Sequence, residues 1–343
     1  MRFSKTVSSP SNSLRTVSII GTGVYLPEKM VTNRDLEKIV DTTDEWIYSR
    51  TGMRERRIAR ADQASSDLAA EAAKAALADA GINAEEVDLL IVATLSPDMF
   101  FPSTACFVQD KIGAKNAYCY DLGAACSGSL YALETAKNQI ACGAVNTALI
   151  IGAEKMSTFI DWKDRNTCVL FGDGAGAMVL RATDAKRGIM KGVFGSDGSL
   201  AHQLWTPGGG SRNPMTPEML DRNEQYLKME GREVYKHAVT QMTKSVLEAL
   251  AANNLSADDI KCFIPHQANA RIINAISSRL GVEDRTFLNV EKYANTSAAA
   301  LPIAIHEAVK SGQLNKGDLM LLVAFGGGFT WGASIVEWVK GNE

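Results

Sequence analysis

The sequence predicts a layered α/β fold built from two duplicated halves. Apolar runs of strand length alternate with segments whose apolar residues recur at helical spacing. Residues 76–91 and residues 249–264 share one pattern: a helix, a turn, an acidic pair and a buried strand. Further along, the strand before Gly152 falls opposite residues 319–323, and Cys126 falls opposite Asn295. Matches in the same order favour an internal duplication, with the halves packed about a pseudo-twofold axis.

We assign residues 1–16 to a flexible N-terminal tail, residues 17–183 to the first half and residues 184–343 to the second. The tail is rich in serine and has only basic charges, so a short organelle transit peptide is the alternative. Residues 17–23 begin like a dinucleotide-binding strand and turn. The third glycine is missing, however, and Pro27 stands where the phosphate-binding helix would begin, so we reject NAD.

The next elements of the first half follow from caps and periodicity. Residues 42–45 read as a capping box for a helix that carries Trp46. An alanine-rich helix over residues 67–80 ends at Gly81 and leads into a buried strand at 87–93. Residues 144–152 give another buried strand.

Composition excludes several classes of protein. The chain has 343 residues, 46% of them hydrophobic, which is enough for a large core, and its net charge of −3 gives no reason to expect nucleic acid. Its six cysteines include no CxxC pair, which favours free thiols in a reducing compartment, the cytoplasm, over disulfides or a metal site. No apolar run reaches about 18 residues, so no membrane span is expected.

Cys126 is the candidate nucleophile. An apolar run at 117–122 predicts a buried strand, and helical spacing then runs from Leu130 to Gly143. Cys126 therefore lies at a helix start, beside free N–H groups and the positive end of the helix dipole, which lowers a thiol pKa. The small residues around it leave room for a substrate. A cysteine packed in the core is the alternative.

His266 and Asn295 are the polar residues of the second half that belong with Cys126. His266 follows a predicted strand at 261–264 and precedes a predicted helix at 267–280, and Asn295 begins the helix that repeats the one after Cys126. Strand ends of duplicated halves commonly build one shared site. A structural histidine is the alternative. Residues 198–228, rich in Gly, Pro and Asn, read as a surface excursion.

Four motifs together resemble the beta-ketoacyl-acyl-carrier-protein synthase III family, the condensing enzymes that initiate type II fatty-acid synthesis. They are Ala-Ala-Cys-Ser-Gly around Cys126, Pro-His-Gln-Ala-Asn around His266, Ala-Asn-Thr-Ser-Ala-Ala around Asn295, and Phe-Gly-Gly-Gly-Phe-Thr-Trp-Gly at 325–332. The likeness runs from about Val17 to the C-terminus. It implies a thiolase-like fold, with two duplicated α/β halves forming a five-layered αβαβα core.

The resemblance also implies the reaction. A short acyl-CoA primer, acetyl-CoA or similar, would condense with malonyl-acyl-carrier protein by decarboxylative Claisen chemistry through an acyl-Cys126 intermediate. The products would be a 3-oxoacyl-carrier protein, CoA and CO2. The CoA thioester is then a substrate, and no cofactor is expected.

Roles for individual residues follow from the same resemblance. The catalytic residues would be Cys126, His266 and Asn295, and the oxyanion hole would be the backbone N–H groups of Cys126 and Gly327. The expected CoA-binding residues are Thr42, Trp46, Arg50, Arg165, Asn269 and Arg271. The expected carrier-protein docking residues are Lys236, Gln267, Ala268, Asn269, Ala270, Arg271 and Arg279. The expected acyl pocket is Phe101, Met156, Phe171 and Phe325. Phe101 matches a residue that reaches into a partner's pocket, so a homodimer is expected, with neither nucleic acid nor membrane as a partner.

Departures from the family pattern leave the acyl-chain preference and the carrier affinity open. They lie at Ser129, Asn166, Arg232, Tyr235 and Ser278.

Several alternatives share parts of these motifs. An enzyme of the same fold that loads starter units in secondary metabolism would carry the same three residues. Hydroxymethylglutaryl-CoA-synthase chemistry needs a carboxylate base, and the loop at 94–97 has no acid. Plant-polyketide-synthase-like enzymes differ in the C-terminal motif. A non-catalytic acyl-binding or scaffolding protein would have lost Cys126, His266 or Asn295.

Overall fold

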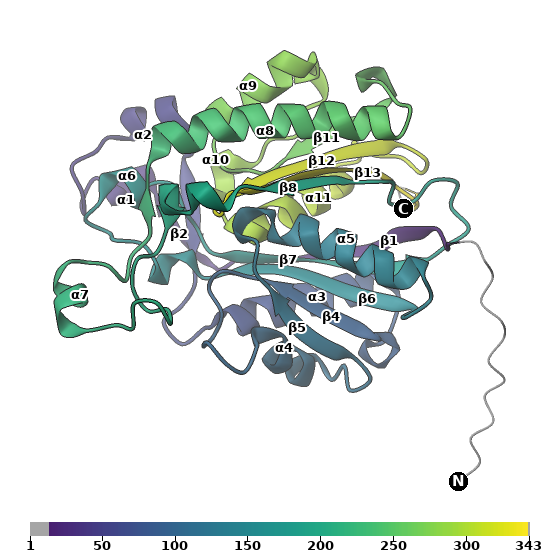
Figure 1. Cartoon of the computed structure of the whole chain (residues 1–343), viewed down its shortest axis with the longest axis horizontal. Helices are drawn as coiled ribbons and strands as arrows, with labels where there is room; N and C mark the ends of the chain where they lie inside the picture. The colour runs from purple at the N-terminus through teal and green to yellow at the C-terminus, as the bar shows by residue number, and fades with distance from the viewer. Residues whose placement is uncertain (1–13, 342–343) are drawn as a thin grey trace, which may run out of the picture.

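The computed structural model describes residues 14–341, which form five layers that alternate between helices and sheets (Figure 1). Two sheets lie on either side of a central helical layer, and further helices cover the outer face of each sheet. This is the layering that the family resemblance predicted.

The first sheet has the order β1-β7-β6-β4-β5. Its strands are β1 (Val17–Tyr25), β4 (Leu89–Ala93), β5 (Tyr118–Leu122), β6 (Thr147–Glu154) and β7 (Gly174–Ala182). Every residue of β4 and β6 is buried, as is typical of strands covered on both faces. The outer face is covered by α3 (Ser65–Ala80) and α4 (Thr104–Ile112). The sequence predicted β5 as a buried strand, but it forms the sheet edge and is only half-buried.

The second sheet has the order β11-β12-β13-β8. Its strands are β8 (Val193–Ser196), β11 (Cys262–Pro265), β12 (Leu319–Gly326) and β13 (Thr330–Glu337). Its outer face is covered by α8 (Gly231–Ala252) and α9 (Ala270–Leu280). The sequence predicted α9 from residue 267, but it begins at Ala270 because the Asn269 side chain caps it by accepting from the Arg271 N–H.

The central layer contains α5 (Gly128–Ala141) and α11 (Ala300–Lys310). Their buried side chains join both sheets in one core cluster, which includes Leu130 and Leu133 from α5 and Leu301 and Ile305 from α11. The enclosed helix α11 is apolar over most of its surface, whereas α5 buries one face and carries polar side chains such as Glu134 and Asn138 on the other. Each helix begins beside the candidate site.

The two sheets repeat one topology. In the first sheet, β1-β7 and β7-β6 are antiparallel pairs and β6-β4 is a parallel pair. In the second sheet, β8-β13 and β13-β12 are antiparallel pairs and β12-β11 is a parallel pair, so β1-β7-β6-β4 corresponds to β8-β13-β12-β11. The predicted register between 147–151 and 319–323 holds at the start of β6 and β12. The register predicted for Cys126 is wrong: the one-turn helices η2 (Ala125–Ser127) and η7 (Ser297–Ala299) correspond, which sets Cys126 opposite Ala298. Loops of different length precede the two turns.

Short elements surround one end of the layers. They are β2 (Lys29–Thr32), β3 (Glu55–Ile58), β9 (Leu204–Trp205), β10 (Lys228–Met229), α1 (Asn33–Leu36), α2 (Asp44–Thr51), α6 (Arg165–Cys168), α7 (Pro217–Asp221) and α10 (Val290–Tyr293). The capping box predicted at 42–45 is absent. The Thr43 hydroxyl caps α2 instead by accepting from the Trp46 N–H at 3.1 Å, while the Glu37 carboxylate accepts from the Asp44 N–H.

The predicted tail ends earlier than expected. Its first 13 residues lie outside the described part of the chain, but Arg15 is held in place. Its backbone N–H donates to the Ala141 carbonyl at 3.0 Å, and its guanidinium donates to the Ile140 carbonyl at 2.8 Å. The carbonyls of residues 138–140 accept from backbone N–H groups just after α5, and Arg15 satisfies the last one, that of Ala141. Within residues 14–341, no helix has the length and apolar character needed to span a membrane.

Candidate active site

Cys126 lies in η2, the single turn that joins β5 to α5, and its side chain is buried. Ala125 has φ 46°, a left-handed conformation that is costly for a residue with a Cβ and that occurs often at active sites. The second half of the chain holds this turn. The Thr330 hydroxyl donates to the Ala124 carbonyl at 3.0 Å, and the Ser127 hydroxyl donates to the Thr330 carbonyl at 3.1 Å.

Gly326, at the end of β12, packs directly against this turn. A Cβ at Gly326 would lie 2.8 Å from the Cys126 nitrogen and 3.0 Å from the Ser127 nitrogen, closer than Cβ atoms approach backbone. Glycine is therefore required at this position for the end of β12 to pack against the Cys126 turn. The next residue, Gly327, lines the same cavity as Cys126.

Burial raises the pKa of the Cys126 thiol to about 11, although hydrogen bonds with the side chains of Ser297 and Asn295 lower it in part. The prediction that the helix start lowers this pKa is therefore wrong for the free protein, because loss of water outweighs the local dipoles. At neutral pH the thiol holds its proton, so a nucleophilic Cys126 requires a proton acceptor.

His266 follows β11 directly, and its N–H donates to the Val323 carbonyl of β12 at 2.8 Å. The ring is 2% exposed, and neither ring nitrogen has a hydrogen-bond partner. Burial lowers the pKa of His266 to about 4, so the ring is neutral at pH 7, with one nitrogen able to donate and the other to accept. Leaving such atoms unpaired is costly, which is typical of groups that await a ligand.

Asn295 is positioned by the first half of the chain. Its N–H donates to the Leu170 carbonyl at 2.9 Å, and its carbonyl accepts from the Gly172 N–H at 3.1 Å. Its side-chain oxygen accepts from the Ser297 N–H at 2.8 Å, and the side chain also hydrogen-bonds to Cys126. Because the oxygen is occupied, the NH2 group is the end that faces the thiol. Ala294 and Ser297, on either side, have φ values of 54° and 49°.

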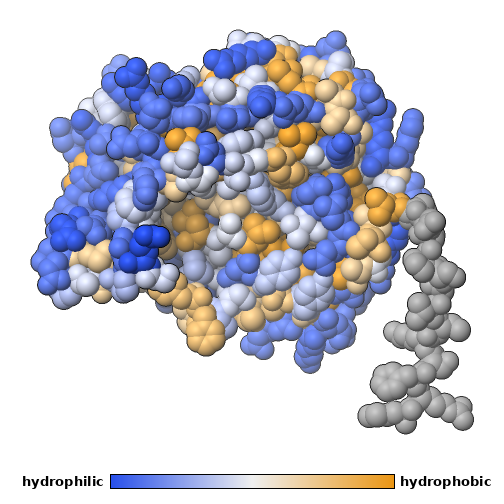
Figure 2. All heavy atoms as spheres, viewed as in Figure 1, coloured by the Kyte–Doolittle hydropathy of each residue, from blue (hydrophilic) through white to orange (hydrophobic). Residues whose placement is uncertain are grey.

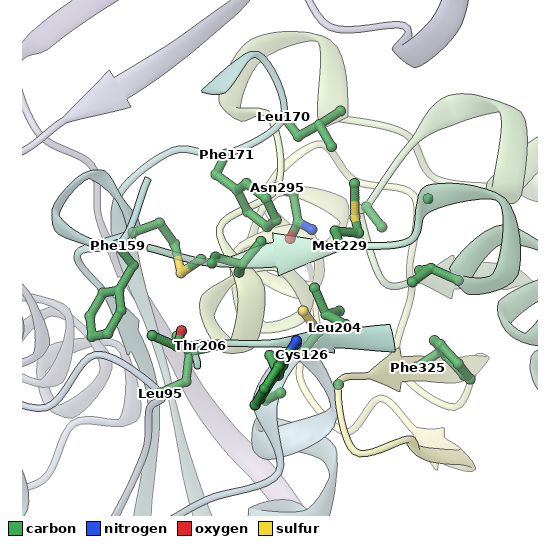
Figure 3. Close-up of a pocket in the computed structure, with 18 of the residues that line it drawn as sticks. Leu95, Cys126, Phe159, Leu170, Phe171, Leu204, Thr206, Met229, Asn295 and Phe325 are labelled. Carbon is green, nitrogen blue, oxygen red and sulfur yellow. The ribbon is translucent and has the colours of Figure 1, made fainter. Parts of the chain in front are cut away.

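Cys126, His266 and Asn295 line one cavity of about 1080 Å³ (Figure 3). Figure 2 shows hydrophobic atoms within a recess and mainly hydrophilic atoms around it. The volume lies at the upper end of the range for small-molecule sites. Most of the lining near Cys126 is apolar: Leu95, Met156, Phe159, Leu170, Phe171, Leu204, Met229 and Phe325.

The residues predicted to bind CoA divide into two groups. Arg50, Asn269 and Arg271 line the cavity, and the Asn269 amide donates to the Arg50 carbonyl at 3.1 Å. Arg50 and Arg271, together with Arg232, place three cationic side chains on the cavity lining. Anionic or polar parts of a ligand would bind there.

Thr42, Trp46 and Arg165 lie outside the cavity lining. Trp46 connects to it, because the Arg50 guanidinium lies 4.5 Å from the indole centroid and the Arg165 guanidinium lies 4.8 Å from it. The residues expected to enclose an adenine therefore contact one another, and a base would have to separate them. The buried Thr42 hydroxyl has no partner.

The predicted docking residues differ in exposure. Lys236, Arg271 and Arg279 are exposed, and Ala268, Asn269 and Ala270 are half-buried. Gln267 is 1% exposed, so its assignment to a docking surface is wrong. Its amide donates to the Pro265 carbonyl at 2.8 Å, and its side-chain oxygen accepts from the Asn289 N–H at 2.9 Å. Gln267 supports the fold behind His266.

The predicted acyl-pocket residues Met156, Phe171 and Phe325 line the cavity, but Phe101 does not. Phe101 is 83% exposed, and its neighbour Phe100 is the residue of this loop that lines the cavity. Phe101 therefore does not form part of this chain's own pocket, and its place in the acyl pocket of a partner stays a prediction. An exposed phenylalanine is available to another chain.

Two features of the site escaped the sequence argument. The sequence predicts residues 198–228 as a surface excursion, yet Gly208, Met215, Gln225 and Leu227 line the cavity. Glu154, the last residue of β6, is fully buried behind the Cys126 turn. In the sequence, Glu154 could have been found as a functional candidate because it is a carboxylate at the end of an apolar strand.

Comparisons with known proteins match this chain over most of its length. Residues 120–198 match the profile of 3-oxoacyl-[acyl-carrier-protein] synthase III, and residues 250–338 match its C-terminal profile. The chain is 51% identical to the beta-ketoacyl-[acyl-carrier-protein] synthase III of Caldanaerobacter subterraneus over 323 residues, which is 94% of this chain and 98% of that protein.

Solved structures give the same result. The 3-oxoacyl-[acyl-carrier-protein] synthase III of Aquifex aeolicus is similar with a TM-score of 0.88 and 47% identity, over 94% of this chain and all of that one. A priming beta-ketosynthase from a polyketide biosynthetic pathway has a TM-score of 0.90 and 32% identity, over 98% of this chain and all of that one.

Proposed function

Because this chain belongs to the beta-ketoacyl-[acyl-carrier-protein] synthase III family, we propose that Cys126, His266 and Asn295 perform its condensing reaction. The protein is an acyltransferase that joins a short acyl-CoA primer to malonyl-acyl-carrier protein and so initiates fatty-acid biosynthesis. The observation that carries the residue assignment is their meeting in one cavity, with the ring nitrogens of His266 unpartnered.

In the first half-reaction, Cys126 takes the acyl group. The thiol loses its proton, and the sulfur attacks the acyl carbonyl of the primer. The bond to the CoA sulfur then breaks, and CoA leaves and becomes protonated. The backbone N–H groups of Cys126 and Gly327 stabilise the oxyanion between these steps. The close packing of Gly326 on the Cys126 turn supports this pairing.

In the second half-reaction, malonyl-carrier protein loses CO2, and the electron pair of the broken C–C bond moves to the thioester oxygen. His266 and Asn295 donate hydrogen bonds to that enolate oxygen. A neutral His266 donates from one ring nitrogen, and burial keeps it neutral at pH 7. Asn295 donates from its NH2 group, because its oxygen is held by the Ser297 N–H. The enolate carbon then attacks acyl-Cys126, and the Cys126 sulfur is released.

Substrates enter along the charged side of the cavity. Arg50, Asn269 and Arg271 bind the CoA or carrier arm, and Trp46 with Arg165 receives the adenine once their contact opens. Exposed Lys236 and Arg279, together with Arg271, attract the acidic surface of a carrier protein. The CoA thioester serves as a substrate, and we expect no cofactor.

The protein acts as a homodimer in the cytoplasm. Three neighbouring apolar side chains, Met99, Phe100 and Phe101, are exposed by 49%, 88% and 83%. The half-buried strand β5 leaves one edge of the first sheet unpaired. A second copy that covers both features would bury apolar surface and satisfy the backbone groups of the edge. Phe101 would then reach the partner's acyl pocket.

A second function is favoured by one comparison. The chain resembles a priming beta-ketosynthase of polyketide synthesis at 32% identity, so the same site suits starter-unit loading. The hydroxymethylglutaryl-CoA-synthase alternative is weaker, because the nearby carboxylate, Glu154, is fully buried and does not line the cavity.

The test is a reconstituted condensation. The purified protein receives malonyl-carrier protein and, in parallel, acetyl-, branched or medium-chain acyl-CoA, and 3-oxoacyl-carrier protein and CO2 are measured. We expect product from a short primer, loss of turnover in Cys126→Ser, and normal turnover in Cys106→Ser, because Cys106 is exposed and outside the cavity lining. Product formation in Cys126→Ser would contradict the assignment.

A further inference from the structure

Glu154 is connected to the candidate nucleophile through one hydroxyl group. The Cys126 sulfur lies 3.5 Å from the Ser297 oxygen and donates to it, and the Ser297 hydroxyl donates to Glu154 Oε1 at 3.0 Å. The two hydrogen bonds point the same way, from thiol to hydroxyl to carboxylate. His266, by contrast, makes no side-chain hydrogen bond to the thiol or to any other group within residues 14–341, because both its ring nitrogens are unpartnered.

The carboxylate itself is enclosed by donors. Oε2 accepts from the Thr94 hydroxyl at 3.2 Å, from the Ser96 N–H at 3.2 Å and from the Ser96 hydroxyl. The Leu95 N–H lies 3.2 Å from both carboxylate oxygens, and the Ala298 N–H lies 3.4 Å from Oε1. Such donors favour the ionised form, which is able to accept a proton.

Burial opposes ionisation and raises the pKa of Glu154 to about 7, so the group changes charge near physiological pH. The groups that face it come from the loop after β4, from η7 and from η2, and Cys126 is the titratable one among them. The ammonium of the adjacent Lys155 is held elsewhere, by the carbonyls of Arg60 and Gln63.

We propose that Glu154 is a positioning residue that receives the thiol proton of Cys126 through the Ser297 hydroxyl. When Cys126 attacks, its proton passes to the Ser297 oxygen while the Ser297 proton passes to Glu154. The S–H bond breaks, a carboxyl O–H bond forms, and Ser297 is unchanged. When the bond between the acyl carbon and the CoA sulfur breaks, Glu154 returns the proton to Ser297, and the Ser297 hydroxyl passes its own proton to the departing CoA sulfur instead of to Cys126. This inference rests on the proposed role of Cys126 as acyl acceptor.

If Glu154 acted on Cys126 only through its charge, removing it would speed the reaction of the thiol, which is the opposite of what a proton acceptor predicts. The negative charge of Glu154 raises the pKa of Cys126, so a neighbour that acted only by charge would make the thiol less reactive. Replacing it by a neutral amide would then make Cys126 more reactive. A proton acceptor predicts a slower reaction, so the sign of the change separates the two roles.

The experiment measures single-turnover acetylation by acetyl-CoA, and iodoacetamide alkylation of the same cysteine, from pH 6 to 10. The variants are Glu154→Gln, Ser297→Ala and, as control, Thr94→Val, which removes a donor to the carboxylate oxygen that does not face Ser297. Ser297→Ala breaks the relay while keeping Glu154, so it carries the test if Glu154→Gln does not fold.

We expect both relay variants to be slowed roughly a hundredfold at pH 7.5, the usual scale of general-base assistance. The wild-type rate should rise near pH 7, whereas the variants should rise only as the thiol itself ionises at higher pH. Thr94→Val should change the rate by less than about tenfold, as for loss of one neutral hydrogen bond. If both relay variants reacted as fast as the wild type or faster, with the same pH profile, the relay would be overturned. The assignment of Cys126 as the acyl acceptor would still stand. Labelling of a different cysteine in the wild-type protein would overturn the proposed function itself.

Discussion

Replacing Asn295 by alanine should separate the two half-reactions. In decarboxylation, Asn295 donates to the enolate oxygen, and loss of one preorganised donor costs about 2.7–4 kcal/mol, or about a hundred- to a thousandfold in rate. In acetylation, the same side chain makes only a hydrogen bond to the thiol. Losing a neutral hydrogen bond costs about 0.5–1.5 kcal/mol, or about two- to tenfold. Decarboxylation should therefore fall at least about tenfold further than acetylation.

The assay measures CO2 release from malonyl-carrier protein and single-turnover acetylation separately on Asn295→Ala. The variant also leaves the buried Ser297 N–H without an acceptor, so some loss of stability is expected. Asn289→Ala controls for that loss. Asn289 is also buried, and its amide donates to Glu307 at 2.9 Å, away from the cavity lining. If acetylation of Asn295→Ala fell as far as decarboxylation, Asn295 would be supporting the Cys126 turn and the reasoning would be refuted.

Three further predictions concern stability, packing and CoA affinity. The unfolded chain binds a proton at His266 near pH 6.5 and the folded chain only near pH 4, so the free energy of unfolding should fall as the pH drops through this window, by up to about 3 kcal/mol. Urea unfolding at pH 7 and pH 4.5 should show a smaller fall in His266→Asn than in the wild type. Equal falls in the two proteins would contradict this. Gly326→Ala should lower turnover at least about tenfold and the free energy of unfolding by about 1–3 kcal/mol, because the added Cβ would meet the Cys126 backbone. Gly123→Ala, which has open space around its Cβ, should retain activity. Similar activity in the two variants would count against the packing argument. Trp46→Ala should raise the CoA Michaelis constant several-fold, as expected for the loss of about 1 kcal/mol of stacking, with turnover nearly unchanged. If steady-state kinetics showed an equal loss of turnover, Trp46 would support the fold and not bind CoA.

Local patterns predicted several of the helices and strands that build the layers, whereas the five-layered arrangement itself was predicted by the family resemblance. The duplicated helix, turn and strand units gave α3 with β4 and α8 with β11, because their apolar periodicity is strong and their termini carry glycine or acidic signals. The motifs around Cys126, His266 and Asn295 lie at strand ends and helix starts, where the topology brings them into one cavity.

What sequence could not supply depends on contacts between distant segments. The thiol pKa of Cys126 follows from burial by chain segments of both halves, which a helix-start argument ignores. The burial of Gln267 depends on its hydrogen bonds to Pro265 and to Asn289, 22 residues away. The role of residues 204–229 as a cavity wall, and the link from Glu154 to Cys126, likewise require tertiary packing.

The most direct test of the account is peptide mass spectrometry of the protein after incubation with acetyl-CoA. The account predicts one acetyl adduct, on the peptide that contains Cys126, and its disappearance when malonyl-carrier protein is added, with an equal amount of 3-oxoacyl-carrier protein formed. An adduct on Cys106 or Cys119 instead, or an adduct on Cys126 that malonyl-carrier protein does not discharge, would contradict it.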